Sequence, residues 1–392
     1  MVAAMRDTVS MDSSVSDEEY QERILPHVSR TFALTIPQLT AALRIPVTNA
    51  YLLCRIADTI EDGTMSSAAA RLGLLQRFVA VLCGEEDAAL LTKDLLPRLS
   101  EQILPAERDL ALNMHRIVRV TASLHEQERG AIRRCVELMC GGMHQFQRIA
   151  SLRGLPGTRD LDEYCYYVAG VVGQMLTELF CAYSPTINLR RSGLEELAVS
   201  FAQGLQMTNI LKDVWEDRER GACWLPQEVF SRYGVELEHL STEQQGTGFD
   251  AGMRELVGVA HAHLRNALSF TLLIPPDETG IRRFCLWAIG LAVLTLRNIE
   301  RTPGFTSGAQ VKVPRSAVAM TQLLSNFAVR NDWLLRRLFE RAAAGLPRAR
   351  LSAPRAPDRS AVSHAEAAAG YSYSASPVRQ LGARRGEGSS RR

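Results

Sequence analysis

Six acidic residues of this chain form two triads with identical spacing, 155 residues apart. They are Asp58, Glu61, Asp62, Asp213, Glu216 and Asp217. On a helix, residues at i, i+3 and i+4 share one face, so each triad would present three carboxylates together. Such a face is ordinarily solvated, because like charges at this spacing repel by about a few tenths of a kcal/mol. Both triads follow apolar runs, however, which indicates partial burial.

If both triads face one cavity, only bound cations make so many carboxylates tolerable. Oxygen ligands suit Mg²⁺ or Mn²⁺ better than zinc. Magnesium usually takes one or two carboxylates and completes its shell with water and phosphate oxygens, so the pattern predicts a diphosphate substrate. Tyr51 and Arg55 extend the first stripe upstream, and Gln206 and Asn209 extend the second. The alternative is two unrelated solvated faces.

Composition and charge argue against a nucleic-acid-binding protein, a zinc protein and a secreted protein. The 392 residues include 45 basic and 43 acidic ones, and the net charge of +2 argues against a nucleic-acid partner. The eight cysteines form no C-x-x-C pair, so we expect free thiols rather than a zinc site. The first twenty residues are too acidic and polar for a signal peptide. We therefore expect a reducing, cytoplasmic location.

The residues that position the triads are predicted to be helical throughout. Ser16 and Glu19 resemble a capping box that opens the first helix. A helix that begins near Pro46 should carry the first triad and end at Gly63. The longest apolar run, residues 284–296, is shorter than the roughly twenty residues of a spanning helix, so no transmembrane segment is expected. Further helices are expected at about 66–83, 85–103, 106–123, 127–150, 160–183, 193–218, 250–273, 278–300 and 315–344.

Three regions are expected along the chain. Residues 1–16 should be a disordered lead-in, and residues 17–345 should form one all-α domain. Residues 346–392 should be a disordered tail, because 348–392 hold nine Arg and three acids with little apolar surface. The tail either solubilises the protein or makes a loose, peripheral contact with anionic lipid.

Several segments resemble the squalene and phytoene synthases, which are head-to-head prenyltransferases. Asp58–Asp62 and Asp213–Asp217 are similar to the two aspartate-rich motifs of that family. The other matching segments are His27–Phe32, Asp162–Gly173, Thr208–Asp213 and Cys223–Phe230. This resemblance implies the isoprenoid synthase fold, an all-α bundle around a central apolar cavity. Trp224–Gly234 and Gly308–Arg315 resemble the squalene branch, whereas Ala288-Ile289 replaces a Pro-Gln pair usual there.

The resemblance also implies roles for individual residues. Both triads, with Asn209, would hold Mg²⁺, and Asp58, Asp62, Asp213, Asp217 and Tyr164 would be catalytic. Lys312 and Arg315 would bind NADPH, for which no G-x-G-x-x-G motif gives independent support. For Tyr164 and Tyr51 core packing is the alternative, and for Lys212 and Arg220 it is a solvated charge. The expected substrate-binding residues are Ser29, Arg30, Phe32, Tyr51, Arg55, Val168, Gly170, Gln206, Asn209, Lys212 and Arg220.

The activity implied is the condensation of two farnesyl diphosphates through presqualene diphosphate, followed by reduction with NADPH. Three alternatives stay open. The chain could be a phytoene or dehydrosqualene synthase that omits the reduction, or a synthase that stops at presqualene diphosphate. It could also be a helical protein that binds divalent metal or lipid without catalysis.

Overall fold

A computed structural model describes residues 15–29, 31–243 and 245–351, and this part of the chain is helical without a β-strand. Two isolated bridges, Thr64 with Leu99 and Leu155 with Pro226, are its β-type contacts. The α-helices of the first half are α1 Asp17–Val28, α2 Phe32–Thr35, α3 Ala41–Asp62, α4 Ala68–Cys83, α5 Ala88–Leu95, α6 Pro105–Leu112, α7 Met114–Ser123, α8 Glu126–Gln147 and α9 Thr158–Cys165. Those of the second half are α10 Val171–Tyr183, α11 Pro185–Asn188, α12 Arg191–Lys212, α13 Val214–Glu219, α14 Gln227–Ser231, α15 Thr247–Leu273, α16 Thr279–Arg301, α17 Arg315–Ala328 and α18 Asp332–Ala342. Short 3₁₀ turns span Ile36–Gln38, Leu96–Arg98 and Leu237–His239.

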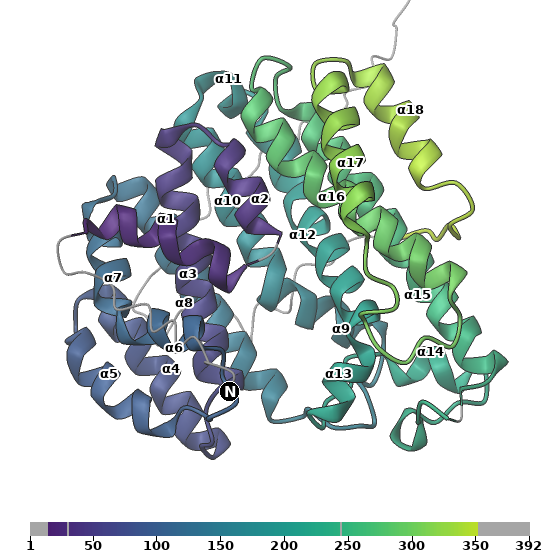
Figure 1. Cartoon of the computed structure of the whole chain (residues 1–392), viewed down its shortest axis with the longest axis horizontal. Coiled ribbons are helices and arrows are strands. Elements are labelled where there is room, and N and C mark those ends of the chain that lie inside the picture. Colours follow the sequence, from purple (N-terminus) through teal and green to yellow (C-terminus); the bar gives the residue numbers. More distant parts are fainter. Residues whose placement is uncertain (1–14, 30, 244, 352–392) are drawn as a thin grey trace, which may run out of the picture. The chain divides into compact units, whose positions relative to one another are not determined.

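The helices form two groups, with α10 and α12 packed between them. In Figure 1, the purple and blue helices α1 to α8 lie on one side, and the green and yellow helices α14 to α18 lie on the other. Helices α10 and α12 lie between them, where α10 packs on α8 and α12 packs along α15. The expected all-α bundle is confirmed.

Two glycines let the central helices approach closely. A Cβ on Gly173 of α10 would lie 2.2 Å from the carbonyl oxygen of Ala198 in α12. A Cβ on Gly204 of α12 would lie 3.0 Å from the backbone nitrogen of Leu264 in α15. Neither position accepts a side chain without moving a neighbouring helix.

Several expected helix boundaries are confirmed and others are wrong. Ser16 caps α1, because its hydroxyl accepts a hydrogen bond from the backbone N–H of Glu19 at 3.2 Å. Helix α3 ends before Gly63 as expected, but it begins at Ala41 and contains Pro46 in its interior. The expected helices at 85–103, 106–123 and 315–344 are each interrupted, by the 3₁₀ turn at 96–98, by Asn113 and by residues 329–331.

Two apolar helical stretches have the length and hydropathy of membrane spans. They are Thr158–Tyr183 and Thr279–Arg301, with mean hydropathies of 1.2 and 1.4. In each, 61% of the apolar window is buried inside the bundle. Helix α16 contains the apolar run of residues 284–296 and buries most of it in the core.

Candidate active site

The first acidic triad lies at the end of α3, which is firmly anchored in the core. Leu52, Leu53 and Ile56 of the same helix are fully buried. The side chain of Asp58 keeps 38% of its surface exposed and lies 3.4 Å from the guanidinium of Arg55. As the spacing predicted, the triad shares one helical stripe with Arg55.

Burial and mutual repulsion disfavour ionisation of this triad. Burial raises the pKa of Asp58 to about 6, opposed by Arg55 and assisted by Asp62. Burial, followed by the charges of Asp62 and Asp58, raises the pKa of Glu61 to about 8. The pKa of Asp62 is also raised by burial, although Arg220 and Arg55 lower it. Three carboxylates held in this way are poised to accept cations.

The second triad lies on a break between two helices rather than on one continuous helix. Helix α12 ends at Lys212, Asp213 adopts φ −99° and ψ 17°, and α13 begins at Val214. The expected uninterrupted helix over 193–218 is therefore wrong at Asp213. The ammonium of Lys212 contacts the carboxylate of Asp213. The backbone N–H of Gly308 donates a hydrogen bond to Oε1 of Glu216 at 2.8 Å.

The two triads lie close enough to influence each other. Burial raises the pKa of Asp217 to about 7, and the charges of Asp213 and Asp62 add to that rise. Burial also raises the pKa of Tyr164 well above its usual value, with further contributions from Glu61, Asp217 and Asp62. Asp62 of α3, Tyr164 of α9 and Asp217 of α13 therefore lie within range of one another's charge.

Tyr164 belongs to an aromatic cluster at this site. Its ring stacks on Trp224 with centroids 4.2 Å apart, and the edge of Phe146 approaches at 5.3 Å. A π-helical turn, Tyr166–Gly170, follows directly and carries Val168. Such turns are frequent at functional sites, because the extra residue per turn displaces side chains relative to an α-helix.

A small apolar hollow lies between α10, α12, α15 and α16. Its free volume is about 10 Å³, room for roughly one water molecule and far below the roughly 300–1,000 Å³ of typical ligand pockets. Phe201 and Phe284 line it, and Phe32 lies 6.5 Å from Phe284 between ring centroids. Long apolar tails would therefore have to displace side chains as they enter. The lining residues are Gly173, Leu176, Phe180, Ala198, Phe201, Phe270, Phe284 and Cys285.

The segment that follows α1 is held against α3. Tyr51 donates a hydrogen bond from its hydroxyl to the carbonyl of Val28 at 3.0 Å, and its ring lies 5.1 Å from that of Phe32. The hydroxyl of Ser29 accepts a hydrogen bond from the N–H of Phe32 at 3.0 Å. Arg30, an expected diphosphate-binding residue, lies outside the described residues.

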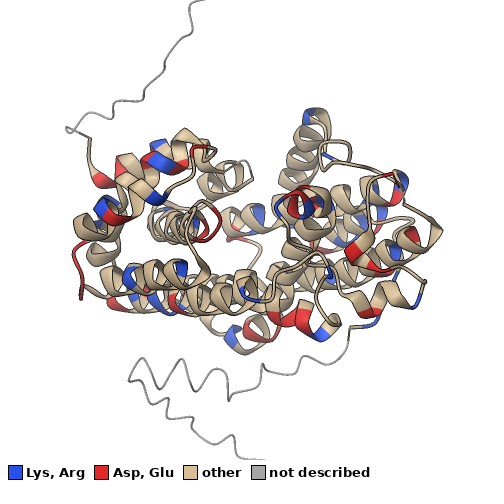
Figure 2. Cartoon of the chain, turned by 90° about the horizontal axis from the view of Figure 1, so that it is seen from below, with Lys and Arg blue, Asp and Glu red and all other residues tan. Residues whose placement is uncertain are grey.

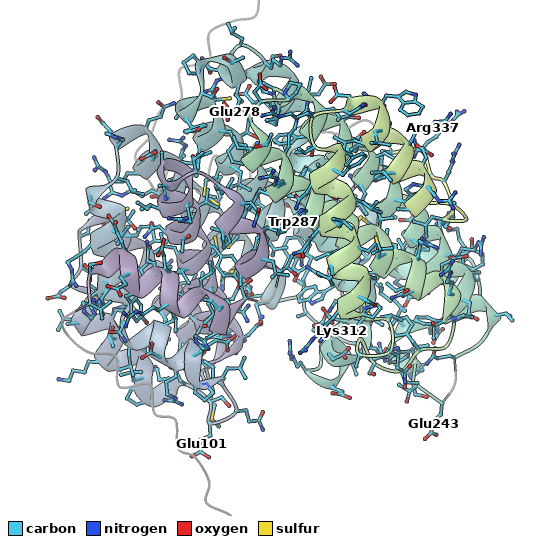
Figure 3. All side chains as sticks on the ribbon, turned by 45° about the horizontal axis from the view of Figure 1, so that its top comes forward. Glu101, Glu243, Glu278, Trp287, Lys312 and Arg337 are labelled. Atoms are coloured by element: carbon cyan, nitrogen blue, oxygen red, sulfur yellow. The ribbon has the colours of Figure 1, made fainter. Side chains whose placement is uncertain are left out.

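The other expected binding residues differ in their placement. On α12, Gln206 is half-buried and Asn209 is exposed. The side chain of Arg220 is 70% exposed and lies 3.8 Å from Asp217. Lys312 and Arg315 are exposed. Figure 3 shows Lys312 on the loop that leads into α17, the loop whose Gly308 contacts the second triad.

Two residues at the site were not foreseen. Glu107, whose side chain is only 13% exposed, contacts Arg55 with 2.5 Å between Oε1 and Nη2. Arg71 lowers the pKa of both Glu61 and Asp62. Glu107 lies in the first turn of α6, which begins at Pro105. The proline predicts the start of a helix, but it does not predict that Glu107 contacts Arg55. Arg71 belongs to no sequence motif that would have indicated its role.

The carboxylate oxygens of the site suit a hard cation such as Mg²⁺ that a phosphate-bearing ligand also coordinates. In the described ranges, no three His, Cys, Asp or Glu side chains converge to hold an ion by themselves. Magnesium commonly binds one or two carboxylates together with phosphate oxygens and water, and the acidic residues here offer that kind of shell. In Figure 2, acidic and basic residues are interspersed over the helices.

Comparison with known proteins identifies the family. The squalene/phytoene synthase family model matches residues 25–317, so the chain belongs to this family. Squalene synthase of Solanum lycopersicum is 31% identical over 290 residues, which cover 71% of this chain and 64% of that protein. Squalene synthase BSS of Botryococcus braunii is 30% identical over 322 residues, which cover 79% of this chain and 65% of that protein. The chain thus spans somewhat less than two thirds of these relatives.

Solved structures share the fold. The complex of TcSQS with BPH1237 has a TM-score of 0.67 at 23% identity and covers 89% of this chain and 96% of its own. A dehydrosqualene synthase complex has a TM-score of 0.55 at 22% identity and covers 78% and 94%. The described helices therefore adopt the isoprenoid synthase fold.

Proposed function

We propose that this protein is a squalene synthase, which condenses two farnesyl diphosphates head to head and reduces the product with NADPH. The observation that carries this proposal is that Asp62, Asp217 and Tyr164, from three helices, lie within range of one another's charge. Carboxylates with raised pKa values near a buried phenol suit a diphosphate head with its cations, and the apolar core helices α10, α12, α15 and α16 would take the prenyl tail. Mg²⁺ would be held by the two triads with Asn209 and would draw negative charge onto the leaving diphosphate.

The chain's own cations would bind and orient the diphosphates. Arg55, held in place by Glu107, lies beside Asp58, and Lys212 lies beside Asp213. Preorganised cations of this kind stabilise the charge that develops as the allylic C–O bond breaks. Arg220 is the most exposed of the three and would reach a diphosphate from the solvent side.

Tyr164 would act in the proton-transfer step as a neutral phenol. Because burial raises its pKa well above the usual value, its hydroxyl is protonated at neutral pH. It can therefore donate a hydrogen bond to released diphosphate, which would take the proton as the cyclopropane closes. Stacking on Trp224 fixes the ring, and both aromatic faces favour a nearby carbocation.

NADPH would supply hydride, and Lys312 and Arg315 offer exposed cations for its phosphates. Ala288 and Ile289, which replace the Pro-Gln pair of the squalene branch, are buried in α16. Their apolar side chains offer no polar contact to a cofactor, and this observation favours a second candidate, a synthase that stops before reduction.

The product formed from farnesyl diphosphate and Mg²⁺, with and without NADPH, tests the proposal. We expect squalene only when NADPH is present. Dehydrosqualene formed in both reactions would establish the dehydrosqualene alternative, and a product made only from a twenty-carbon donor would overturn the substrate assignment. Presqualene diphosphate that accumulates despite NADPH would identify a half-reaction enzyme.

Two substitutions separate catalysis from folding. Asp58→Asn and Asp213→Asn should abolish turnover while the helical circular dichroism signal stays unchanged. Glu236→Gln is the matched control, because its side chain is 80% exposed and lies in neither triad. Near-native turnover in both triad variants would overturn the assignment of the site. A folded wild-type protein that releases no diphosphate would favour the non-catalytic metal-binding or lipid-binding alternative.

We also propose that residues 17–345 form the synthase unit, that the enzyme works on the cytoplasmic side, and that the Arg-rich residues 346–392 add peripheral contact with anionic lipid. Residues 1–14 and 352–392 lie outside the described part of the chain.

A further inference from the structure

Helix α17 presents its most apolar side chains to the outside. Four residues at i, i+3, i+4 and i+7 form one stripe along it. Their exposed fractions are 53% for Met320, 63% for Leu323, 40% for Leu324 and 81% for Phe327. Of the fourteen residues of α17, only Ala328 is buried.

The inner side of α17 carries the more polar residues. Val318, Thr321 and Gln322 face α2 and α16, where they line a hollow with Leu34, Trp287 and Leu291. A soluble helix normally buries its apolar stripe and exposes its polar one. In α17 the largest apolar side chains lie on the outside instead, which marks the outer stripe as a surface that binds a partner.

The stripe is held rigidly by the bundle. Arg282 of α16 is fully buried and donates hydrogen bonds to the carbonyl of Val329, at 3.0 Å, and to the carboxylate of Asp332, at 2.7 Å. These bonds fix the turn between α17 and α18. The methyl group of Thr321 packs where Gly290 of α16 has no side chain. The outer stripe is therefore a preformed face and not a frayed end.

Basic residues surround the stripe. The 31 residues from 301 to 331 contain four basic residues and no acidic one. Arg315 begins α17 and Arg330 follows its end. On α18, the guanidinium of Arg337 lies 5.4 Å from the ring centroid of Trp333, whose surface is 65% exposed. Figure 3 shows Lys312 on the loop before α17 and Arg337 on α18.

We propose that the outer stripe of α17, together with Trp333, docks the protein onto an anionic lipid bilayer. Apolar side chains on one helix face, an interfacial tryptophan and a basic rim are the features that place a helix in the plane of a membrane surface. Neither Arg330 nor Arg337 forms an ion pair with an acidic side chain within the described ranges, so their charges are free to meet lipid phosphates.

The charges favour lipid over a second copy of the chain. In a twofold-symmetric dimer through α17, each basic rim would meet the same basic rim of the partner. Like charges placed opposite each other weaken such a contact. The proposal is independent of the substrate, and it assigns membrane contact to the folded domain in addition to the tail.

Flotation of the full-length chain with lipid vesicles tests the proposal. We would compare vesicles of neutral phosphatidylcholine with vesicles that also contain roughly a third of phosphatidylglycerol. The test variant is the double substitution Leu323→Ser with Phe327→Ser. Leu189→Ser is the matched control, because Leu189 is 87% exposed and lies after α11, outside this face. The tail is identical in all three proteins, so a difference between them reports the stripe alone.

We expect the wild-type protein to bind anionic vesicles at least about tenfold more tightly than neutral ones, because each basic residue near the surface adds to the attraction. The double variant should lose roughly tenfold or more in binding, while Leu189→Ser should bind as the wild type does. Unchanged thermal unfolding would show that the double variant is folded. Its unchanged turnover of farnesyl diphosphate in detergent would separate docking from catalysis.

Three results would overturn the proposal. The first is a wild-type protein that does not float with anionic vesicles. The second is a double variant that binds as tightly as the wild type, which would assign lipid contact to the tail alone. The third is sedimentation equilibrium that shows a wild-type dimer and a monomeric double variant without lipid binding, which would make the stripe a self-association surface.

Discussion

Substitution of Glu61 measures how much the crowded carboxylates of the first triad lower the free energy of unfolding. Burial and the charges of Asp62 and Asp58 raise its pKa from 4.5 to about 8. An acid with a raised pKa binds its proton more tightly in the folded state than in the unfolded one. Stability should therefore fall as pH rises from 4.5 to about 8, in the absence of bound cations.

The size of this effect follows from the same values. A displacement from 4.5 to about 8 corresponds to at most roughly 4–5 kcal/mol. Glu61 is only half-buried and its charge is coupled to two neighbours, so we expect about 1–2 kcal/mol. Glu61→Gln cannot ionise and escapes this cost. It should be more stable than the wild type by about that amount at pH 8, and by less than about 1 kcal/mol at pH 5.

Urea denaturation followed by circular dichroism, in the presence of EDTA, measures this difference. Glu236→Gln, which removes an exposed carboxylate, should match the wild type at both pH values. Addition of Mg²⁺ and pyrophosphate should reverse the order, because the wild type binds them more tightly than Glu61→Gln does. A Glu61→Gln protein that is no more stable than the wild type at pH 8, or equally stabilised at pH 5, would refute this reasoning.

Three further substitutions test other contacts. Glu107→Gln removes the charge that holds Arg55, so the KM for farnesyl diphosphate should rise about tenfold in a pyrophosphate-release assay; an unchanged KM would show that Glu107 does not position Arg55. Gly308→Ala would put a Cβ 2.9 Å from Oδ1 of Asp213, so kcat/KM should fall roughly tenfold to a hundredfold. Gly141→Ala is the control, because Gly141 has open space around it, and it should leave kcat/KM unchanged. Equal activities of the two alanine variants would contradict this. Arg282→Met leaves buried carbonyls without donors and should lower the free energy of unfolding in urea by about 3 kcal/mol; a loss below about 1 kcal/mol would show that α17 is fixed otherwise.

Local spacing predicted the parts of the site that one helix carries. The first triad and Arg55 share a stripe because the period of a helix places i, i+3 and i+4 together. Gly63 ended α3 as expected. The start of α3 was missed because Pro46 reads as a helix start, although here it is accommodated in the helix interior.

Features that depend on tertiary packing could not be predicted. The break at Asp213 has no Gly or Pro signal, and the π-helical turn at Tyr166–Gly170 follows a sequence that reads as a plain helix. The contact between Glu107 and Arg55 joins residues 52 positions apart. No periodicity within one element reports such a pair.

The central claim is that both acidic triads bind one magnesium–diphosphate group. A double-mutant cycle of Asp62→Asn and Asp217→Asn, measured by isothermal titration of the metal-loaded protein with pyrophosphate, tests it directly. A shared site predicts that the two losses in binding free energy differ from additivity by more than about 1 kcal/mol. Losses that add to within about 0.5 kcal/mol would place the triads at independent sites and contradict the account.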